Sequence, residues 1–395
     1  MSSPSYTLAW HTSIDEIPKA AWDALAMPLA TPFLEWEWLN NLETSGSVSG
    51  QTGWQPCHLT LWRDRQLVAA APLYVKSHSY GEFVFDHQWA DLSHRLGMAY
   101  YPKLLGMTPI TPTVGYRFLI AAGEDEVEIC DRLVSAIDRF CNHNQLSGCN
   151  FLFVDPDWQP MMQQLGFSAW QHHSYIWSNH NFQAFEDYLK IFKSNQRKNI
   201  KRERKAVTTA NLRVDTLTGE AIPHPLYTQI YNFYASTCEK FYWGSKYLTQ
   251  HFFEQLYPKY SDRVVLFVAY HEDYSDQKPV GLSFCLRKGE NFYGRYWGCL
   301  EEFDCLHFEA CYYKPIEWAI SQGIQMYDPG AGGRHKRRRG FPATKNYSLH
   351  RFYHERMNLI LQSYIGEINE MEQAELEAIN NDLPFNKEVI QIKID

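Results

Sequence analysis

The sequence lacks the features of a membrane-spanning or disulfide-bonded protein. Its nine cysteines include no Cys-x-x-Cys pair, which favours reduced thiols over a disulfide framework. No apolar run approaches the roughly 18 residues that cross a bilayer. The start, Met-Ser-Ser-Pro-Ser-Tyr, has no basic region followed by an apolar stretch, so it does not look like a signal peptide. From these absences we expect a soluble, cytoplasmic protein.

Positive charge is also in short supply. The 37 Lys and Arg residues face 45 Asp and Glu, for a formal net charge of −8. Such a balance argues against a dedicated nucleic-acid-binding protein, which is usually basic as a whole. The cations are concentrated, however, with eight between Lys190 and Lys205 and five between Arg334 and Arg339. These two runs are therefore the first candidates for an anion-binding site.

Apolar strand patterns alternate with helical ones, which predicts a mixed α/β fold. We expect a β-hairpin from Leu67–Val75 and Glu82–Phe85, a helix near Val127–Gln145, and a strand at Phe151–Val154. After Tyr353 the chain becomes acidic and helical, which predicts a C-terminal helix on the surface. At about 100 to 200 residues per domain, the length of 395 residues suggests two domains.

The second half repeats landmarks of the first. Val68-Ala69 and Lys76 match Val280-Gly281 and Lys288, and Tyr80-Gly81 matches Tyr293-Gly294. Each half then has a helix, a glycine, a short strand and Asp-Pro, at Asp155-Pro156 and Asp328-Pro329. Repeats in the same order predict a duplicated domain. We expect domains at residues 1–180 and 181–354, with a helical extension over residues 355–395.

The first basic run has helical spacing. One face would carry Lys190, Lys193, Arg197, Lys201 and Arg204, and another would carry Phe192, Ile200 and Val207. Arginine binds phosphate through two parallel hydrogen bonds, so this face could cradle phosphates. The alternative is an ordinary solvated face. Because many like charges on one helix repel each other, we favour the binding interpretation.

The second run follows a glycine-rich turn, Gly330-Ala-Gly332-Gly333, directly after a predicted strand. Glycines allow positive φ and expose backbone N–H groups, as in anion-binding nests. No Lys-Ser or Lys-Thr closes the turn at the spacing of a nucleotide-binding P-loop. A generic turn is the alternative, but five cations close by favour an anion-binding loop.

A third candidate region is Gly294-Arg295-Tyr296-Trp297-Gly298, followed by His307 and Glu309 at a helix start. The glycines suggest close approach of a backbone or a ligand, and His307 and Glu309 are acid–base candidates. A histidine at a helix start is more often a cap. Cys299, Cys305 and Cys311 surround His307 without a standard zinc spacing, so we predict no metal site.

Together these segments resemble the FemAB-like family of N-acyltransferases. The resemblance is carried by Tyr100-Tyr101-Pro102-Lys103-Leu104, Pro109–Pro112 with Gly115 and Arg117, Arg197–Arg204, Phe241–Leu248, Gly294–Gly298, His307–Tyr313 and Gly330–Phe341. It implies two tandem domains with the acyl-CoA N-acyltransferase (GNAT-type) fold, each a mixed sheet flanked by helices. It also implies transfer of an acyl or aminoacyl group to an amine.

This resemblance implies acyl-CoA or aminoacyl-tRNA as donor, with no tightly bound cofactor. A CoA-binding turn would lie at Leu300–Asp304, which is acidic and has no glycine, so CoA is doubtful there. An anionic small-molecule or nucleotide-linked substrate, or tRNA, is the expected partner; the oligomeric state stays open.

Within this reading, His307 or Glu309 accepts a proton and Tyr296 donates to the developing oxyanion. The substrate would be held by residues of both basic runs and their surroundings: Arg197, Lys198, Arg202, Trp243, Arg295, Arg334, His335, Lys336 and Arg338. The alternatives are a non-catalytic module that binds RNA or an anionic cell-wall precursor, and a partner interface formed by the basic runs.

Overall fold

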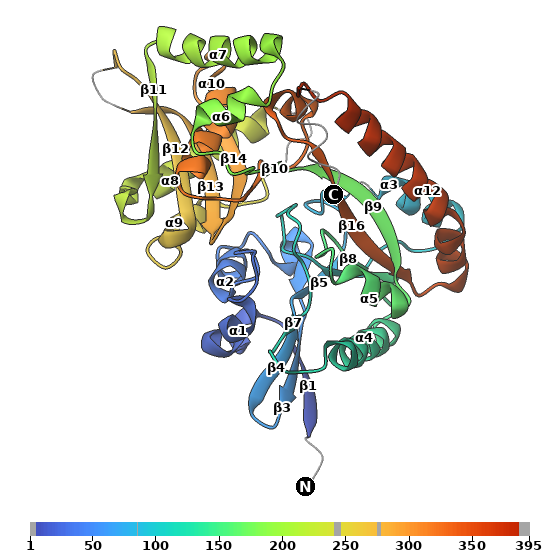
Figure 1. Ribbon diagram of the computed structural model, residues 1–395. Helices are drawn as coiled ribbons and strands as arrows, with labels where there is room; N and C mark the ends of the chain where they lie inside the picture. The colour runs from blue at the N-terminus through green and yellow to red at the C-terminus, as the bar shows by residue number, and fades with distance from the viewer. Residues whose placement is uncertain (1–4, 85, 241–245, 275–277, 387–395) are drawn as a thin grey trace. The chain divides into compact units, whose positions relative to one another are not determined.

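The computed structural model describes residues 5–84, 86–240, 246–274 and 278–386, and the chain divides into two compact units (Figure 1). The first unit contains residues 1–173 and 345–374, and the second contains residues 174–344 and 375–395. This division differs from the contiguous one expected from the sequence, because a segment near the C-terminus returns to the first unit. Each unit is built around mixed β-sheet, as predicted.

In its described residues the first unit has two sheets, the helices α1 to α5 and the larger part of a long C-terminal helix. One sheet has the order β1-β3-β4-β7 and the other β2-β5-β6-β8-β16-β9. The strands are β1 (Tyr6–His11), β2 (Trp54–Pro56), β3 (His58–Arg63), β4 (Gln66–Ala71), β5 (Leu73–Lys76), β6 (Lys103–Gly106), β7 (Leu119–Ile120), β8 (Gly148–Phe151), β9 (Ser168–Tyr175) and β16 (Ala343–Phe352). The helices are α1 (Lys19–Ala26), α2 (Trp36–Thr44), α3 (His87–Arg95), α4 (Glu126–His143) and α5 (Gln159–Gln164).

The second unit has one sheet of order β10-β15-β14-β13-β12-β11. Its strands are β10 (Trp177–Ser178), β11 (Leu212–Thr218), β12 (Val264–His271), β13 (Pro279–Lys288), β14 (Asn291–Cys299) and β15 (Met326–Asp328). Its helices are α6 (Phe185–Lys190), α7 (Ser194–Thr209), α8 (His224–Glu239), α9 (Gln250–Glu254), α10 (Leu306–Phe308) and α11 (Lys314–Ser321), with a π-helical turn at Glu309–Tyr313. The long helix α12 (Glu355–Asn381) belongs to the first unit up to Ala374 and to the second unit from Glu375.

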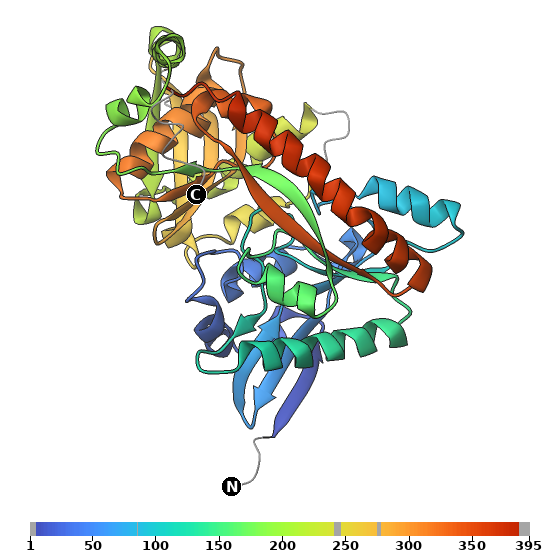
Figure 2. The same cartoon turned by 45° about the vertical axis from the view of Figure 1, so that its right-hand side comes forward.

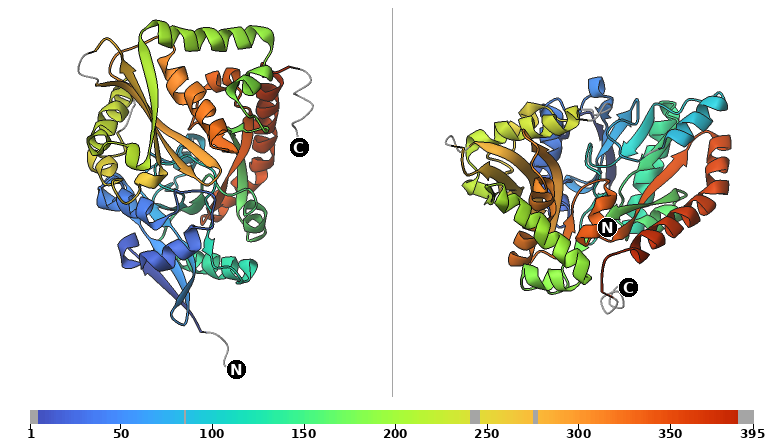
Figure 3. Two further views of the ribbon diagram at one scale, coloured as in Figure 1. Left: turned by 60° about the vertical axis from the view of Figure 1, so that its left-hand side comes forward. Right: turned by 90° about the horizontal axis from the view of Figure 1, so that it is seen from above.

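Both faces of the second unit's sheet are covered. Phe267 and Phe292 belong to a core that includes side chains of α6, α7 and α11, while Phe284 packs against Phe253 of α9. Strand β12 is apolar at every position from Val264 to Ala269, as expected for a strand buried on both sides. Figure 3 shows α7 beside the helices that follow β14.

The strand pairing confirms the duplication but not every landmark. In the second unit, β12–β13 and β13–β14 are antiparallel and β14–β15 is parallel. In the first, β3–β4 and β5–β6 are antiparallel and β6–β8 is parallel. Gly294 lies in β14, whose counterpart is β6, whereas Gly81 lies in a turn. The match of Tyr80-Gly81 to Tyr293-Gly294 is therefore wrong.

The predicted hairpin is also wrong. β4 pairs with β3 through a turn at Asp64, which has φ of 57°. Pro72 then separates β4 from β5, because proline has no N–H to donate to a ladder; β5 pairs with β2 and β6. Residues 82–84 form no strand. The predicted helix near residues 127–145 is confirmed as α4, whose N-cap Asp125 accepts hydrogen bonds from the Val127 and Glu128 backbones.

The chain returns to the first unit through β16. β16 pairs antiparallel with β8, from Leu349 opposite Phe151 to Phe352 opposite Gly148. It is the neighbour of β9 on its other side, and Figure 2 shows the two long strands together with α12. The predicted C-terminal helix is confirmed as α12.

Candidate active site

A cavity of about 410 Å³ in the second unit brings the two basic runs together. α7 supplies Gln196, Asn199, Arg202 and Glu203, and Phe308 of α10 forms part of the wall. The remaining residues of the pocket wall lie on a 3₁₀ helix, Arg334–Arg339. The lining residues of this segment are Arg334, His335, Arg337, Arg338 and Arg339. We call this cavity the arginine pocket; five guanidinium groups face one carboxylate in it.

Arg339 is the fixed arginine of this pocket. Only 4% of it is exposed, and its Nη2 donates to Glu203 at 2.9 Å while Nη1 donates to the His335 carbonyl at 3.0 Å. The guanidinium lies 3.3 Å from the centre of the Phe308 ring, a close cation–π contact. Its Nε has no hydrogen-bond partner among the described residues. A buried N–H without a partner is costly, so Arg339 carries an unsatisfied donor inside the wall of the pocket.

Glu203 also accepts a hydrogen bond from Tyr313, next to the pocket. The Tyr313 hydroxyl donates to its carboxylate in a short hydrogen bond. The Gln196 side chain donates to the Arg338 carbonyl at 2.7 Å. α7 and the 3₁₀ helix are therefore joined at two points, one on each side of Arg202.

The other arginines differ in how they are neutralised. Arg337 lies 3.0 Å from Asp382, and Arg334 lies 3.6 Å from Glu375. Within the part of the chain that the structure describes, neither Arg202 nor Arg338 has an ion pair. Both are exposed. Two cations in the wall are thus open to an anion from solvent.

Lys336 does not line the pocket. It is buried, and its ammonium donates to the carbonyls of Gly330 and Ala331, the second at 3.1 Å. Burial lowers the pKa of Lys336 to about 8. Its position shows that it fixes the shape of the glycine-rich turn, and its ammonium is turned inward.

The glycines predicted to permit close approach do so towards backbone. A side chain on Gly294 would lie 2.9 Å from the Tyr327 hydroxyl and 3.5 Å from the carbonyl carbon of Pro329, and one on Gly298 would overlap the Phe233 carbonyl at 1.8 Å. The turn at Gly330 thus packs on β14, and α8 packs on its end. Protein therefore approaches both glycines closely: the Tyr327 side chain and then the turn backbone at Gly294, and the α8 backbone at Gly298.

His335 sits between the glycine-rich turn and a helix. Its Nε2 is 2.8 Å from the Tyr312 hydroxyl, and a side chain on Gly333 would come within 2.8 Å of its Cε1. The His307 ring is 5.7 Å away, centre to centre. His335 is exposed as a residue, but partial burial of its ring, with Arg339 and Lys336 close by, lowers the pKa of His335 to about 4. Burial and the same cations, together with His335, lower the pKa of His307 to about 4. Both imidazoles are therefore neutral at pH 7.

Glu309 is engaged in an internal ion pair. Its carboxylate accepts three hydrogen bonds from Arg204, at 2.9 to 3.2 Å, and Arg204 also contacts Glu317. Glu309 is 6% exposed, and burial raises its pKa although Arg204 acts in the opposite direction. Arg204, which we expected on the cationic face of the helix, therefore connects α7 to the π-helical turn and to α11. The helix expected from Lys190 is in fact two, α6 and α7.

The remaining predicted residues lie outside the pocket lining. Tyr296 packs against Tyr234, Phe253 and Phe284. Arg295 lies beside the glycine-rich turn, 3.8 Å from where a side chain on Gly330 would begin. Arg197 and Lys198 are on the first turns of α7. Trp243 lies outside the described residues.

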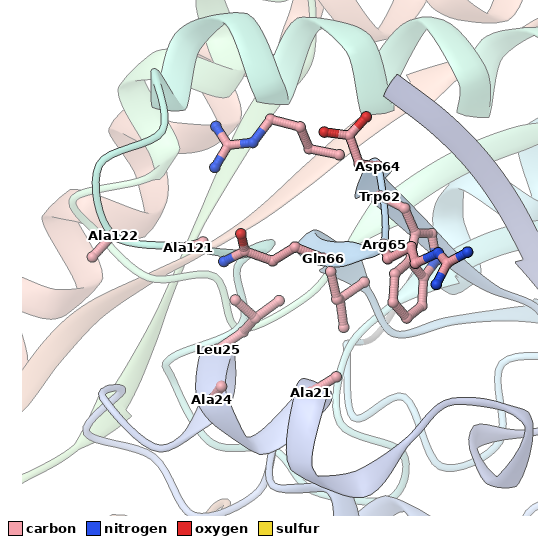
Figure 4. Close-up of a pocket in the computed structure, with 11 residues that line it drawn as sticks. Ala21, Ala24, Leu25, Trp62, Asp64, Arg65, Gln66, Ala121 and Ala122 are labelled. Atoms are coloured by element: carbon pink, nitrogen blue, oxygen red, sulfur yellow. The ribbon is translucent and has the colours of Figure 1, made fainter. Parts of the chain in front are cut away.

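Two other cavities have different chemistry. One of about 760 Å³ in the first unit lies between α1 and the β3–β4 turn, lined by small and apolar side chains together with Arg63, Asp64, Arg65 and Gln66 (Figure 4). A third of about 510 Å³ includes the paired Arg204 and Glu309. Among the described residues no cluster of three His, Cys, Asp or Glu could hold a metal ion.

Sequence reasoning did not identify Glu203, Tyr312 or Arg339. Arg339 was visible as part of the second run, but nothing in the sequence distinguishes it from Arg338. Tyr312 stands in an aromatic stretch that reads as core, and its partner is 23 residues away.

The fold and the site together define an α/β chain of two sheet-based units, with an arginine-lined pocket in the second unit. The chain belongs to the FemAB-like family: the family model, described as peptidoglycan biosynthesis and recognition, matches residues 13–387. The predicted resemblance and fold class are confirmed. No curated protein matches significantly.

Several solved structures share this fold. The structure of FemX is 12% identical, with a TM-score of 0.52, and the match covers 91% of this chain and 100% of that one. The C-terminal domain of a putative lysylphosphatidylglycerol synthetase from Agrobacterium fabrum is 7% identical (TM-score 0.51; 89% and 97% covered). A conserved protein of unknown function from Bacteroides thetaiotaomicron is 10% identical (TM-score 0.50; 87% and 99%).

The described part of the chain contains no helix with the length and apolar character needed to cross a bilayer.

Proposed function

We propose that this protein transfers an acyl or aminoacyl group from an activated donor to an amine, and that the arginine pocket holds a phosphate-bearing part of the donor or acceptor. The observation that carries the proposal is the pocket itself. Two basic runs about 130 residues apart in the sequence converge on one cavity, and guanidinium groups bind phosphate oxygens through pairs of hydrogen bonds.

Family membership and fold support a transferase. FemX and a putative lysylphosphatidylglycerol synthetase domain have this fold. Fold alone does not identify a reaction, so the proposal depends on the pocket for its substrate class. Aminoacyl-tRNA and acyl-CoA both carry phosphates and are the donors we propose to test.

Alignment supplies much of the catalysis that this reaction needs. Holding an amine next to an activated ester or thioester contributes on the order of 7 to 11 kcal/mol to lowering the barrier. A pocket that binds the phosphate end of one substrate fixes its position relative to the glycine-rich turn. Acyl transfer between two bound substrates requires no metal ion in this scheme.

The test is anion-dependent stabilisation. Inorganic pyrophosphate should raise the Tm of the protein, because a ligand that binds only the folded state stabilises it by RT ln(1 + [L]/Kd). At a concentration of about 100 Kd the gain is about 2.7 kcal/mol. Arg202→Met and Arg338→Met should each weaken pyrophosphate binding at least tenfold.

Lys198→Met is the matched control, since Lys198 is an exposed cation of α7 outside the pocket lining. It removes the same charge and should leave binding within twofold. Equal losses in all three variants would mean that net charge alone attracts the anion, and the pocket would be refuted as a site.

A second candidate function is binding of RNA or another polyanion without catalysis. It is favoured by a cationic stripe on α7, formed by Arg197, Lys198, Lys201, Arg202 and Lys205, which have no ion pairs among the described residues. An RNA complex that uses this stripe should weaken steeply with salt, since each neutralised phosphate releases counterions. Charge removal at Lys201 and Lys205 should reduce that salt dependence without changing pyrophosphate binding.

A further inference from the structure

We propose that His335 is the proton acceptor of the transfer reaction, that Tyr312 positions its ring, and that an anion entering the arginine pocket makes the ring a stronger base. This inference rests on the proposed function. It assigns a catalytic group to the edge of the same pocket and couples that group to substrate binding.

Three features define the position of the ring: a hydrogen bond with Tyr312, the closeness of Gly333 and its place in the wall of the arginine pocket. The Tyr312 hydroxyl is 2.8 Å from Nε2 and fixes that edge of the imidazole. Gly333, with φ of 89°, lies so close that a β-carbon would be 2.8 Å from Cε1 and 3.3 Å from Nδ1. His335 also lines the arginine pocket. The ring is therefore held in place at the boundary between the anion and the glycine-rich turn.

The other sequence-derived candidates are less suited to accept the proton. Glu309 has its carboxylate filled by three hydrogen bonds from Arg204. His307 lies behind His335 and is not part of the pocket lining. His335 is the histidine that faces the place where we expect the substrate phosphate.

In the reaction, the amine nitrogen bonds to the carbonyl carbon of the ester or thioester. The bond from that carbon to oxygen or sulfur breaks, and the electron pair leaves with the oxygen or sulfur. The amine loses a proton to the free nitrogen of His335, and the leaving group takes up a proton. The products are an amide and an alcohol or thiol, with His335 neutral again.

The coupling follows from the charges around the ring. Those on the same segment are Arg334, Lys336, Arg337, Arg338 and Arg339, and those on packed elements are His307, Tyr312, Arg202 and Glu203. Burial is the larger cause of the lowered His335 pKa of about 4, and repulsion by Arg339 and Lys336 adds to it. A dianion in the pocket offsets this repulsion. Its binding should raise the pKa towards the ordinary value of about 6.5, which is better matched to a general base at neutral pH.

Anion binding and protonation of His335 affect each other equally, so their coupling can be measured from either one. Sulfate is a suitable probe because it remains a dianion over the pH range in which His335 is titrated. The full-length protein is prepared with histidine labelled at Cε1, the His335 signal is assigned from the spectrum of His335→Gln, and the signal is titrated with and without saturating sulfate. We expect sulfate to raise the pKa of His335 by at least one unit, which is a tenfold change in its protonation constant.

Two variants separate a catalytic position from a structural one. Gly333→Ala should displace the ring and reduce the sulfate-induced shift, and Tyr312→Phe should remove the contact to Nε2 and change the titration of free His335. Lys345→Met, which removes an exposed cation outside the pocket lining and outside both basic runs, should change neither. If either of the first two fails to fold, the other still tests the position of the ring.

Each outcome decides a point. A raised His335 pKa on sulfate binding supports the inference. If sulfate binds, with Arg338→Met weakening it, but His335 titrates as before, the inference is wrong and the proposed function stands. If sulfate does not bind at the pocket, the proposed anion site fails and the inference falls with it.

Discussion

Removing the Arg339 guanidinium should destabilise the second unit. Arg339→Met keeps much of the apolar stem but leaves Glu203 without its 2.9 Å partner and Phe308 without its cation. The side chains of Arg339 and Glu203 are 5% and 15% exposed. Breaking a buried ion pair costs about 3 to 5 kcal/mol, and because Glu203 retains some solvent contact we expect the lower figure, about 3 kcal/mol.

The loss should appear in two measurements. For a unit of 150 to 250 residues, about 3 kcal/mol lowers Tm by roughly 6 to 12 °C. Urea unfolding should show the same loss with an unchanged m-value. Arg339→Lys should fall between wild type and Arg339→Met, because lysine keeps the charge but cannot stack or donate through a planar fork.

Arg338→Met is the matched control, since Arg338 is exposed and has no ion pair in the described ranges. It should change the free energy of unfolding by less than about 0.5 kcal/mol. A double-mutant cycle with Glu203→Gln should give a coupling energy well above zero. If Arg339→Met costs no more than Arg338→Met, the guanidinium does not anchor the pocket and this account is refuted.

Two further predictions concern the first unit. Lys103→Met should cost about 3 to 5 kcal/mol in urea unfolding, because the buried Lys103 ammonium donates to Glu82 at 2.8 Å and Asp86 at 2.7 Å and both carboxylates would lose it; a cost below 1 kcal/mol would contradict the burial of this cluster. Burial lowers the pKa of His350 to about 3, so below about pH 6.5 the unfolded chain takes up a proton that the folded chain does not, and stability should fall by about 2 kcal/mol at pH 5. His350→Gln should remove that part of the pH dependence, and an unchanged difference between pH 7 and pH 5 would show that other groups cause it.

The sequence was sufficient to predict the fold class and to single out the two basic runs that line the arginine pocket. Thirteen cations placed in two short runs of an acidic chain are a strong signal, because repulsion makes such runs unfavourable without a ligand. The roles predicted for the acid–base residues stay predictions, but the sequence did not show their surroundings. Glu309 has the right residue type, but its ion pair with Arg204 joins positions 105 residues apart, and no local pattern records such a contact.

Strand partners were the other part that the sequence did not reveal. The hairpin failed because Leu67–Val75 reads as one apolar run, whereas Pro72 divides it between two sheets. The position of β16 beside β8 depends on contacts between residues about 200 apart. Periodicity identifies a strand but contains no information on which distant strand will pair with it.

The return of β16 has a consequence for the order in which the protein folds during synthesis. Strand β8 has β6 on one side and β16 on the other, so one edge of β8 stays unpaired until the ribosome has made residues up to 352. An open edge of this kind can pair with other chains, and nascent chains grow at about 5 to 20 residues per second. The first unit, although it begins at the N-terminus, therefore cannot complete its sheet before residues 174–344 of the second unit have been made.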